Sequence, residues 1–300
     1  MTATAVAPVP DTAPAPDIAP TPTLHPVAEA IASGTIPGRV WFYSNYHCNL
    51  ACTYCFTESS PTVAKRAMDP EQILRPAAEA SELGYTDFGI TGGEPFLLPY
   101  MVDLLKDLSA LGPTIVISNG TVFGPRRFTR ATELAGHDVA IQISLDAAEP
   151  DLNDEMRREE NFNKVVDLVP RLVDAGVKVR IATTVEDGRL NADQHNELCA
   201  LHRSWGITDD DHIVHPVIHR GRAAEEDMGT HLAFHEFPAE LTFSVDGACW
   251  GPFGPSFTDG KLDTDLLITR TLEPVSTAAS ALLRLADGRP QGADTQLGIR

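Results

Sequence analysis

The stretch Asn45–Glu58, NYHCNLACTYCFTE, gathers Cys48, Cys52 and Cys55 in the spacing C-x3-C-x2-C, and the aromatic Tyr54 directly precedes the third cysteine. Three thiolates on so short a loop lie close together, and a metal or an iron-sulfur centre is the usual reason for gathering them. The loop supplies only three ligands. A four-iron four-sulfur cluster held this way keeps one iron open, as expected of a site for chemistry rather than for structure.

Two other interpretations of the cysteines are a structural zinc knuckle and a redox pair formed by Cys52 and Cys55. Zinc needs a fourth nitrogen or sulfur ligand, and His47 is an awkward sequential neighbour for that role. A thioredoxin-like pair needs no third cysteine. The spacing therefore favours the cluster.

Around this loop the sequence predicts strands and helices in alternation. Strands are expected at 39–44, 87–91, 114–118, 139–145, 177–185 and 212–218, and helices at 70–83, 101–111, 126–134, 163–175 and 192–205. Six strands separated by amphipathic helices favour parallel pairing with right-handed crossovers. The fold class is α/β. The cysteine loop follows the first strand, so it lies at the carboxyl end of the sheet, where such folds place their sites.

Three further motifs occupy the ends of the next strands: Gly92-Gly93-Glu94-Pro95, Ser118-Asn119-Gly120 and Ser144-Leu145-Asp146. With the cysteine spacing, they make the chain resemble the radical S-adenosylmethionine (radical SAM) enzymes from about Val40 to at least Val185. The resemblance implies a partial (β/α)6 TIM-like barrel with one 4Fe-4S cluster and S-adenosylmethionine as cofactors. In that family the methionyl amine and carboxylate chelate the open iron. One electron then cleaves the cofactor to methionine and a 5′-deoxyadenosyl radical, which takes a hydrogen atom from the substrate.

The first candidate cofactor-binding residues are Tyr54 and the glycine motif. Gly92 and Gly93 suit an ordinary strand-to-helix turn, but they also leave space for a ligand beside the backbone. Glu94 offers a carboxylate to an ammonium group, and the resemblance implies that this motif binds the methionyl amine. Asn119 is a candidate contact of cofactor or substrate, although Asn-Gly is also a plain turn.

The remaining candidates lie on the fourth and fifth strands. Ser144 and Asp146 are two residues apart and share a side, and the family uses such groups on the ribose hydroxyls; a helix cap and turn is the alternative. Arg157 follows Asn153-Asp154 in the arrangement His-Asp-x2-Arg of related enzymes, with Asn in place of His, and is a candidate for the cofactor carboxylate. Thr183 is placed for adenine or ribose contact, or is a half-buried strand threonine.

Bulk properties limit the setting of this chemistry. The chain has 300 residues, 43% of them hydrophobic, and a net charge of −19, which repels nucleic acid. Five cysteines, three of them clustered, do not form a disulfide framework, and no apolar run reaches the length of a membrane span. We expect a cytoplasmic protein that uses an external electron donor such as flavodoxin or ferredoxin, and no membrane.

Three regions are predicted: a disordered Pro/Ala-rich tail at 1–26, the barrel at 27–222 and a C-terminal extension or lid at 223–300. Cys199 is interpreted as a core residue, and Cys249 as a rim thiol that donates hydrogen or contacts substrate. Trp250 and Phe253 are lid aromatics or packing residues. The predicted substrate is a small polar metabolite, a sugar or nucleoside, in natural-product tailoring. The alternatives are modification of a ribosomally made peptide and a non-catalytic iron-sulfur protein for electron transfer or sensing.

Overall fold

The computed structural model describes residues 25–186, 188–233 and 236–287, so the predicted tail and the last residues of the chain fall almost entirely outside the described ranges. The predicted parallel strands are confirmed. In sheet order they are β1 (Arg39–Tyr43), β2 (Asp87–Thr91), β3 (Thr114–Ser118), β4 (Val139–Ser144), β5 (Lys178–Val185) and β6 (His212–Pro216). They form the arc of a partial barrel.

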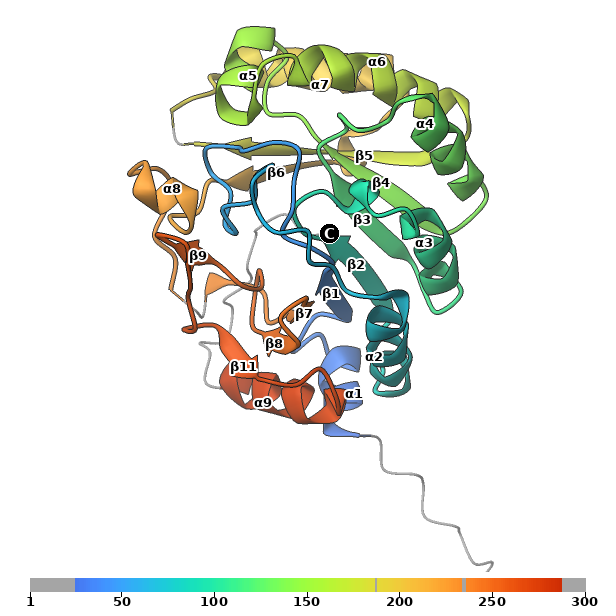
Figure 1. Cartoon of the computed structure of the whole chain (residues 1–300), viewed down its shortest axis with the longest axis vertical. Coiled ribbons are helices and arrows are strands. Elements are labelled where there is room, and N and C mark those ends of the chain that lie inside the picture. Colours follow the sequence, from blue (N-terminus) through green and yellow to red (C-terminus); the bar gives the residue numbers. More distant parts are fainter. Residues whose placement is uncertain (1–24, 187, 234–235, 288–300) are drawn as a thin grey trace, which may run out of the picture.

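The outer side of this arc carries the crossover helices, as Figure 1 shows. They are α2 (Pro70–Glu82), α3 (Met101–Ser109), α4 (Pro125–Ala131) continued by η2 (Thr132–Leu134), α6 (Asn161–Asp174) and α7 (Ala192–Ser204). Each was predicted to within a few residues at its ends. The short helix α5 (Pro150–Arg157) was not predicted.

The local sequence explains why these elements form. Helix α6 buries Val165, Leu168, Val169 and Leu172, spaced as one face of a helix requires. Helix α7 begins with reciprocal bonds between Asn191 and Gln194, each 3.0 Å long. Strand β1 is buried along almost its whole length, as expected of a parallel strand covered on both faces. Burial of each large apolar side chain contributes about 1.5–3 kcal/mol.

The segment after 222 contributes more than a lid. Strand β7 (Leu241–Ser244) pairs in parallel with β1, with Val40 opposite Leu241, and turns back into β8 (Ala248–Trp250). Strand β11 (Leu267–Thr269) completes a nine-stranded sheet in the order β11-β8-β7-β1-β2-β3-β4-β5-β6. Within the described ranges, β6 and β11 are the free edges of this sheet, so the barrel does not close.

Smaller elements complete the C-terminal segment and the connections. The predicted hairpin is present as β9 (Phe257–Thr258) and β10 (Lys261–Leu262), and the last helix is α9 (Val275–Asp287), beside α1 (Pro26–Ala32) in Figure 1. The others are η1 (Pro95–Leu97), η3 (Asp209–Asp211) and α8 (Arg222–Glu225). No helix in the described ranges is long and apolar enough to cross a membrane.

Candidate active site

The cysteine loop leaves β1 and crosses the carboxyl end of the sheet (Figure 1). It is fastened to the glycine motif after β2 by backbone bonds: Gly93 N–H donates to the Asn45 carbonyl at 2.8 Å, and Glu94 N–H donates to the His47 carbonyl at 3.1 Å. These bonds fix the first half of the loop against β2.

The two glycines are required by how closely this loop approaches. A Cβ atom on Gly93 would lie 2.3 Å from the His47 carbonyl oxygen, and one on Gly92 would lie 2.5 Å from the Asn45 side-chain oxygen. Gly92 also has a φ of +145°. Any larger residue would push the cysteine loop away from β2.

The other side of the loop is held by the start of α8. The Arg222 backbone N–H donates to the Cys55 carbonyl at 3.0 Å, and its guanidinium donates to the carbonyls of Cys52 and Ser59. Gly221 allows this contact, since a Cβ there would lie 2.3 Å from the Phe56 carbonyl oxygen. The segment after β6 therefore stabilises the loop that carries the three cysteines.

The sulfur atoms fit a cluster better than a single ion. Cys48 Sγ lies 3.4 Å from the Leu50 N–H and 3.6 Å from the Asn119 side-chain amide, and such N–H donors are typical of cluster ligands. Burial raises the pKa of Cys48 to about 12 and that of Cys52 to about 11, so without a bound metal both thiols keep their protons at neutral pH.

A mononuclear zinc site requires a tighter group. Ligand atoms around one zinc ion lie within about 4 Å of one another, as bond lengths of about 2.0–2.3 Å dictate. Among the described residues, Cys48, Cys52 and Cys55 do not form a group of three whose ligand atoms all lie within 4.8 Å. A cubane, in which each cysteine binds a different iron, suits this wider spacing.

Glu94 lies at the same end of the barrel as the cysteines and is completely buried. Its carboxylate accepts hydrogen bonds from Phe96 N–H at 3.0 Å, from the Ser118 hydroxyl at 3.0 Å and from Asn119 N–H at 2.8 Å. Burial raises its pKa to about 7, against the lowering effect of these donors. The side chain joins the glycine motif to the end of β3, while Gly92 and Gly93 themselves line the pocket beside the cysteines.

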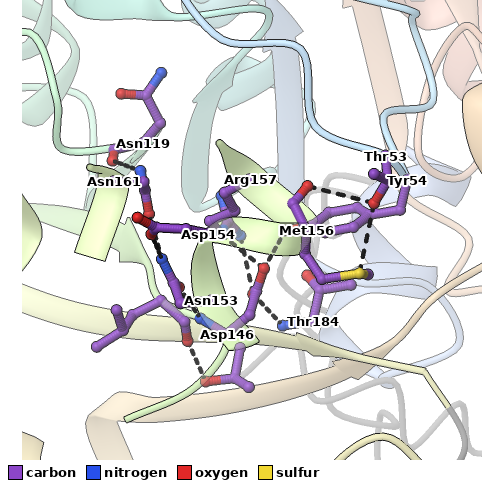
Figure 2. Close-up of polar contacts among 12 residues, drawn as sticks. Thr53, Tyr54, Asn119, Asp146, Asn153, Asp154, Met156, Arg157, Asn161 and Thr184 are labelled. Atoms are coloured by element: carbon purple, nitrogen blue, oxygen red, sulfur yellow. Dashed lines mark hydrogen bonds and ion pairs between the residues drawn. The ribbon is translucent and has the colours of Figure 1, made fainter. Parts of the chain in front are cut away.

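Asp146, after β4, is the centre of a second network, which Figure 2 shows. Its carboxylate pairs with Arg157, at 2.7 Å from Nε and 3.0 Å from Nη2, and accepts from the Tyr54 hydroxyl at 2.8 Å and from Thr184 N–H at 2.9 Å. The Arg157 guanidinium also lies over the Tyr54 ring, 5.5 Å from its centre. Both charged groups are almost completely buried. The cysteine loop, β4 and β5 are thus locked together.

Asparagines continue this network, and one of them occupies the position where the related pattern has His. Asn153 accepts from Asp146 N–H at 2.9 Å and donates to the Asn161 side chain at 2.8 Å. Asn161 in turn donates to the Asn119 carbonyl at 3.3 Å (Figure 2). The Asn153 amide therefore supports Asp146 and links it to the end of β3.

Two adjoining cavities occupy the mouth and the interior of the barrel. The smaller, of about 80 Å³, is lined by Cys48, Leu50, Cys52, Cys55, Ser59, Gly92, Gly93, Ile117, Ser118, Asn119, Ser144 and Arg157. The larger, of about 270 Å³, runs down between the strands and includes Tyr54, Phe56, Thr91, Gln142, Thr184, His215, Thr242 and Phe253. Cys55, Ile117, Ser144 and Arg157 line both cavities, so the cysteine pocket and the barrel interior are neighbours.

Five sequence candidates line neither cavity. Glu94 and Asp146 keep their carboxylates within the two hydrogen-bond networks described above, and the other three point elsewhere. The Thr183 hydroxyl donates to the Leu145 carbonyl at 2.7 Å and contacts His212, while its neighbour Thr184 lines the larger cavity. Cys249 is completely buried in β8, with its Sγ 3.2 Å from the Thr271 carbonyl, and it lines neither cavity. Trp250 is also buried and donates to Ser244, so of the two predicted lid aromatics only Phe253 reaches the cavity.

Sequence reasoning missed two groups of the site. Asn161 begins a helix whose other buried residues are mostly apolar, and nothing in the local pattern marks its amide. Glu240 precedes β7 and lines the larger cavity, where its carboxylate accepts from Trp41 Nε1–H at 2.7 Å. The parallel pairing of β7 with β1 brings Glu240 there, and this long-range contact has no local sequence signal.

The geometry agrees with comparisons to known proteins. Curated relatives include the GTP 3′,8-cyclase of Streptomyces coelicolor, 31% identical over 54% of this chain and 48% of the relative, and the antilisterial bacteriocin subtilosin biosynthesis protein AlbA of Bacillus subtilis, 26% identical over 67% and 45%. This chain thus spans about half the length of the curated relatives that it matches. Streptococcus suis SuiB, solved bound to its precursor peptide SuiA, shares the fold with a TM-score of 0.57 at 15% identity, over 74% of this chain and 61% of SuiB.

Family matching covers the part of the chain that carries the site. Residues 43–189, from the end of β1 to just beyond β5, match the Radical SAM superfamily. This range holds the three cysteines, the glycine motif and the Asp146 network, and its cofactors in the family are a 4Fe-4S cluster and S-adenosylmethionine. Residues 43–189 of this chain form a Radical SAM domain.

Proposed function

We propose that this protein is a radical SAM enzyme that removes a hydrogen atom from a small polar metabolite held inside the barrel. Cys48, Cys52 and Cys55 would hold one 4Fe-4S cluster. When bound and reduced by one electron, the cluster supplies cleavage of S-adenosylmethionine to methionine and a 5′-deoxyadenosyl radical. The electron would come from an external donor of the flavodoxin or ferredoxin type.

The residues around the smaller cavity support a site for the methionyl part of the cofactor. Gly92 and Gly93 present backbone there without side chains, which suits the approach of an ammonium group. Arg157 lines the same cavity, and its ion pair with Asp146 holds the guanidinium in place. The guanidinium is therefore positioned to bind the carboxylate of the cofactor as well. Asn119 and Ser144 add polar side chains to this wall. The single observation that carries the proposal is this convergence of cysteines, bare backbone and a buried arginine at one pocket.

The rigid network below the pocket supports the ribose side. Tyr54, Asp146 and Thr184 are joined by bonds of 2.8 and 2.9 Å, so none of them needs to reorganise when a cofactor binds. Preorganised polar groups of this kind hold two reacting atoms at about 3–3.5 Å from each other, the separation from which they react.

The larger cavity supports a small substrate. Its volume of about 270 Å³ must admit both the adenosyl group and the reacting part of the substrate, because it adjoins the cysteine pocket. Its far end, where the strands begin, carries Arg39, Arg180 and Glu240. These charged groups suit a substrate with polar groups at the end away from the abstracted hydrogen, such as a sugar or nucleoside.

Aromatic side chains close the cavity on the side of the C-terminal segment. Phe253 lines it and packs edge-on against Phe56, with ring centres 5.8 Å apart, and against Phe237 at 4.8 Å. An apolar wall excludes water and reactive side chains from a carbon radical.

Modification of a peptide is the second candidate function. It is favoured by the relatives, since one is a bacteriocin biosynthesis protein and one solved structure with the same fold contains a precursor peptide. In that case a single side chain of the peptide would enter the cavity past Phe253. The two cysteines outside the loop, Cys199 in α7 and Cys249 in β8, lie in separate elements and cannot support a second cluster in the usual manner.

The test measures transfer of substrate hydrogen into 5′-deoxyadenosine. The anaerobically reconstituted protein receives dithionite, S-adenosylmethionine and either deuterated sugars and nucleosides or short deuterated peptides. Deuterium in 5′-deoxyadenosine from the first set supports the proposal, and deuterium from the peptides alone supports the second function. An intact cofactor with a reducible cluster would indicate an electron carrier or sensor and would refute both.

A further inference from the structure

A second group of potential metal ligands lies on the outside of the barrel, away from the cysteine loop. Cys199 and His202 of α7 and His212 at the start of β6 each have one ligand atom within 4.8 Å of the other two. His195, one helical turn before Cys199, brings its Nε2 to 3.5 Å from the Cys199 sulfur. On α7 these residues have the spacing i, i+4, i+7, so they share one face of the helix.

The described residues do not supply enough hydrogen-bond donors for the imidazole nitrogens of this group. The only hydrogen of the Thr183 hydroxyl goes to the Leu145 carbonyl, so the 2.8 Å contact between Thr183 and His212 Nε2 needs the hydrogen of the imidazole. His212 Nδ1 then carries a lone pair, and it lies 3.7 Å from the Cys199 sulfur.

His202, in the protein interior, also has one protonated ring nitrogen and one that carries a lone pair. Its ring is completely buried, and its Nδ1 lies 3.2 Å from the Ile207 carbonyl, an acceptor that requires Nδ1 to be protonated. Nε2 is therefore a lone-pair atom, and it has no hydrogen-bond partner among the described residues. The nearest charge is Asp209, 3.9 Å away and already paired with Arg203. A single thiol hydrogen on Cys199 cannot satisfy both lone pairs.

We propose that Cys199, His202 and His212 form a structural zinc site that joins α7 to the start of β6. His195 contacts the Cys199 sulfur but lies outside the group of three, so it would have to turn toward the ion to become the fourth ligand. Zinc prefers sulfur and imidazole ligands in a tetrahedral arrangement, with Zn–S of about 2.3 Å and Zn–N of about 2.0–2.1 Å, which places sulfur and nitrogen about 3.5 Å apart. The two Cys199 sulfur-to-nitrogen distances are 3.5 and 3.7 Å.

The surroundings match those of a metal site in a second respect. Zinc-bound histidines usually donate their other ring N–H to a carbonyl, carboxylate or other oxygen, which fixes the ring. The Ile207 carbonyl does this for His202, and the Thr183 hydroxyl oxygen does it for His212. This accounts for Thr183, whose side chain lines neither cavity.

The site has a structural consequence for the barrel edge. Strand β6 is an edge of the sheet in the described ranges, and the segment that follows it supplies Arg222, which holds the cysteine loop. A metal that fixes the start of β6 to α7 would stabilise this open side of the sheet.

The test is element-specific, so the iron cluster does not interfere. The full-length protein is reconstituted anaerobically with iron and sulfide, given one equivalent of zinc and desalted. We expect one zinc per chain, and an X-ray absorption spectrum at the zinc edge with one sulfur and several nitrogen neighbours. In Cys199→Ser the sulfur neighbour is lost, while in Cys249→Ser, the matched buried-cysteine control, it remains.

A milder variant tests the site in case Cys199→Ser does not fold. Thr183→Val keeps all four ligands but removes the acceptor for His212, and we expect zinc affinity to fall about 10–100-fold. Zinc that washes out of the wild-type protein would overturn the proposal. So would a zinc shell of three sulfurs, which would place the ion on the cluster cysteines.

Discussion

The two ends of the barrel bury charge in different ways. At the carboxyl ends of the strands, Asp146 and Arg157 form a two-point ion pair at 2.7 and 3.0 Å, and Tyr54 and the Thr184 N–H complete the shell of the carboxylate. Every contact is short, and the group is nearly inaccessible to solvent.

At the amino ends the ion pairs of the two arginines that line the larger cavity are longer. Arg39 lies 3.9 Å from Asp87, and Arg180 lies 3.6 Å from Asp211. Glu240 accepts one bond from Trp41, and burial raises its pKa to about 7. In the proposed function these ends have different roles: the carboxyl end is fixed in advance for the cofactor, while the charged groups at the amino end would exchange their contacts for those of a substrate.

The largest expected effect is at the carboxyl end. Cys52→Ala removes one of the three proposed cluster ligands, so we expect loss of the cluster and no 5′-deoxyadenosine above background, measured after anaerobic reconstitution with dithionite. Cys249→Ala is the matched control, because this thiol lines neither cavity, and it should keep both iron and turnover. Loss of turnover with normal iron content in the control would restore Cys249 as a reacting group.

Arg157→Met tests how strongly the carboxyl end depends on its ion pair. Removing one partner of a buried pair leaves an uncompensated charge, so the free energy of unfolding of the cluster-free protein should fall by about 3–5 kcal/mol. Denaturant titration measures it. Arg158→Met is the control at an exposed neighbour and should change stability by less than about 0.5 kcal/mol. Equal losses in the two variants would contradict the fixed network.

Glu240→Gln tests the amino end through pH. Because the folded-state pKa of Glu240 is raised from 4.5 to about 7, folding favours the protonated form. Its contribution to stability is present below pH 4.5 and is lost as the pH rises through 7. Glutamine still accepts from Trp41 and does not ionise. Relative to the variant, the wild type should therefore lose about 2–3 kcal/mol between pH 5 and pH 8, since one pKa unit is worth about 1.4 kcal/mol.

Thermal or denaturant unfolding of both proteins at the two pH values checks this result. The difference between the proteins is the measured quantity, so other titrating groups cancel. If the difference in stability between the two proteins does not vary with pH, the Glu240 carboxylate is solvated and the account of the amino end is wrong.

Gly93→Ala tests the close contact between the glycine motif and the cysteine loop. The new methyl group meets the His47 carbonyl, and such overpacking costs about 1–3 kcal/mol. Displacement of the loop should also reduce the iron content after reconstitution. Gly124→Ala places its methyl group in open space, with a φ of −61°, and should bind iron normally. Normal iron binding by Gly93→Ala would show that the loop tolerates movement.

Much of the fold could be predicted because its signals are local. Strand 114–118 carries the apolar run Ile115–Ile117, strand 87–91 has apolar Phe88 and Ile90, and the structure places both strands at those limits. Helix α5 was missed because its buried face consists of Asn153, Met156 and Arg157, so it has no apolar periodicity. Its buried polar side chains are stabilised by hydrogen bonds to Asp146 and Asn161, which lie elsewhere in the chain.

The candidate site followed the same rule. The cysteine, glycine and Asp146 motifs follow strand ends, and parallel pairing brings them together, as predicted. The direction of each side chain was harder to infer: Thr183 and Thr184 are adjacent, yet only Thr184 lines the cavity. The group on α7 was not recognised because Cys199 was interpreted alone, although His195 and His202 share its helical face.

The central claim is that three cysteines hold a cluster whose fourth iron is open to the cofactor. Electron paramagnetic resonance of the reduced, reconstituted protein tests it most directly, with and without S-adenosylmethionine. We predict a cubane signal whose g values shift when the cofactor is added, since its amine and carboxylate bind the open iron. A signal that the cofactor leaves unchanged would contradict this account.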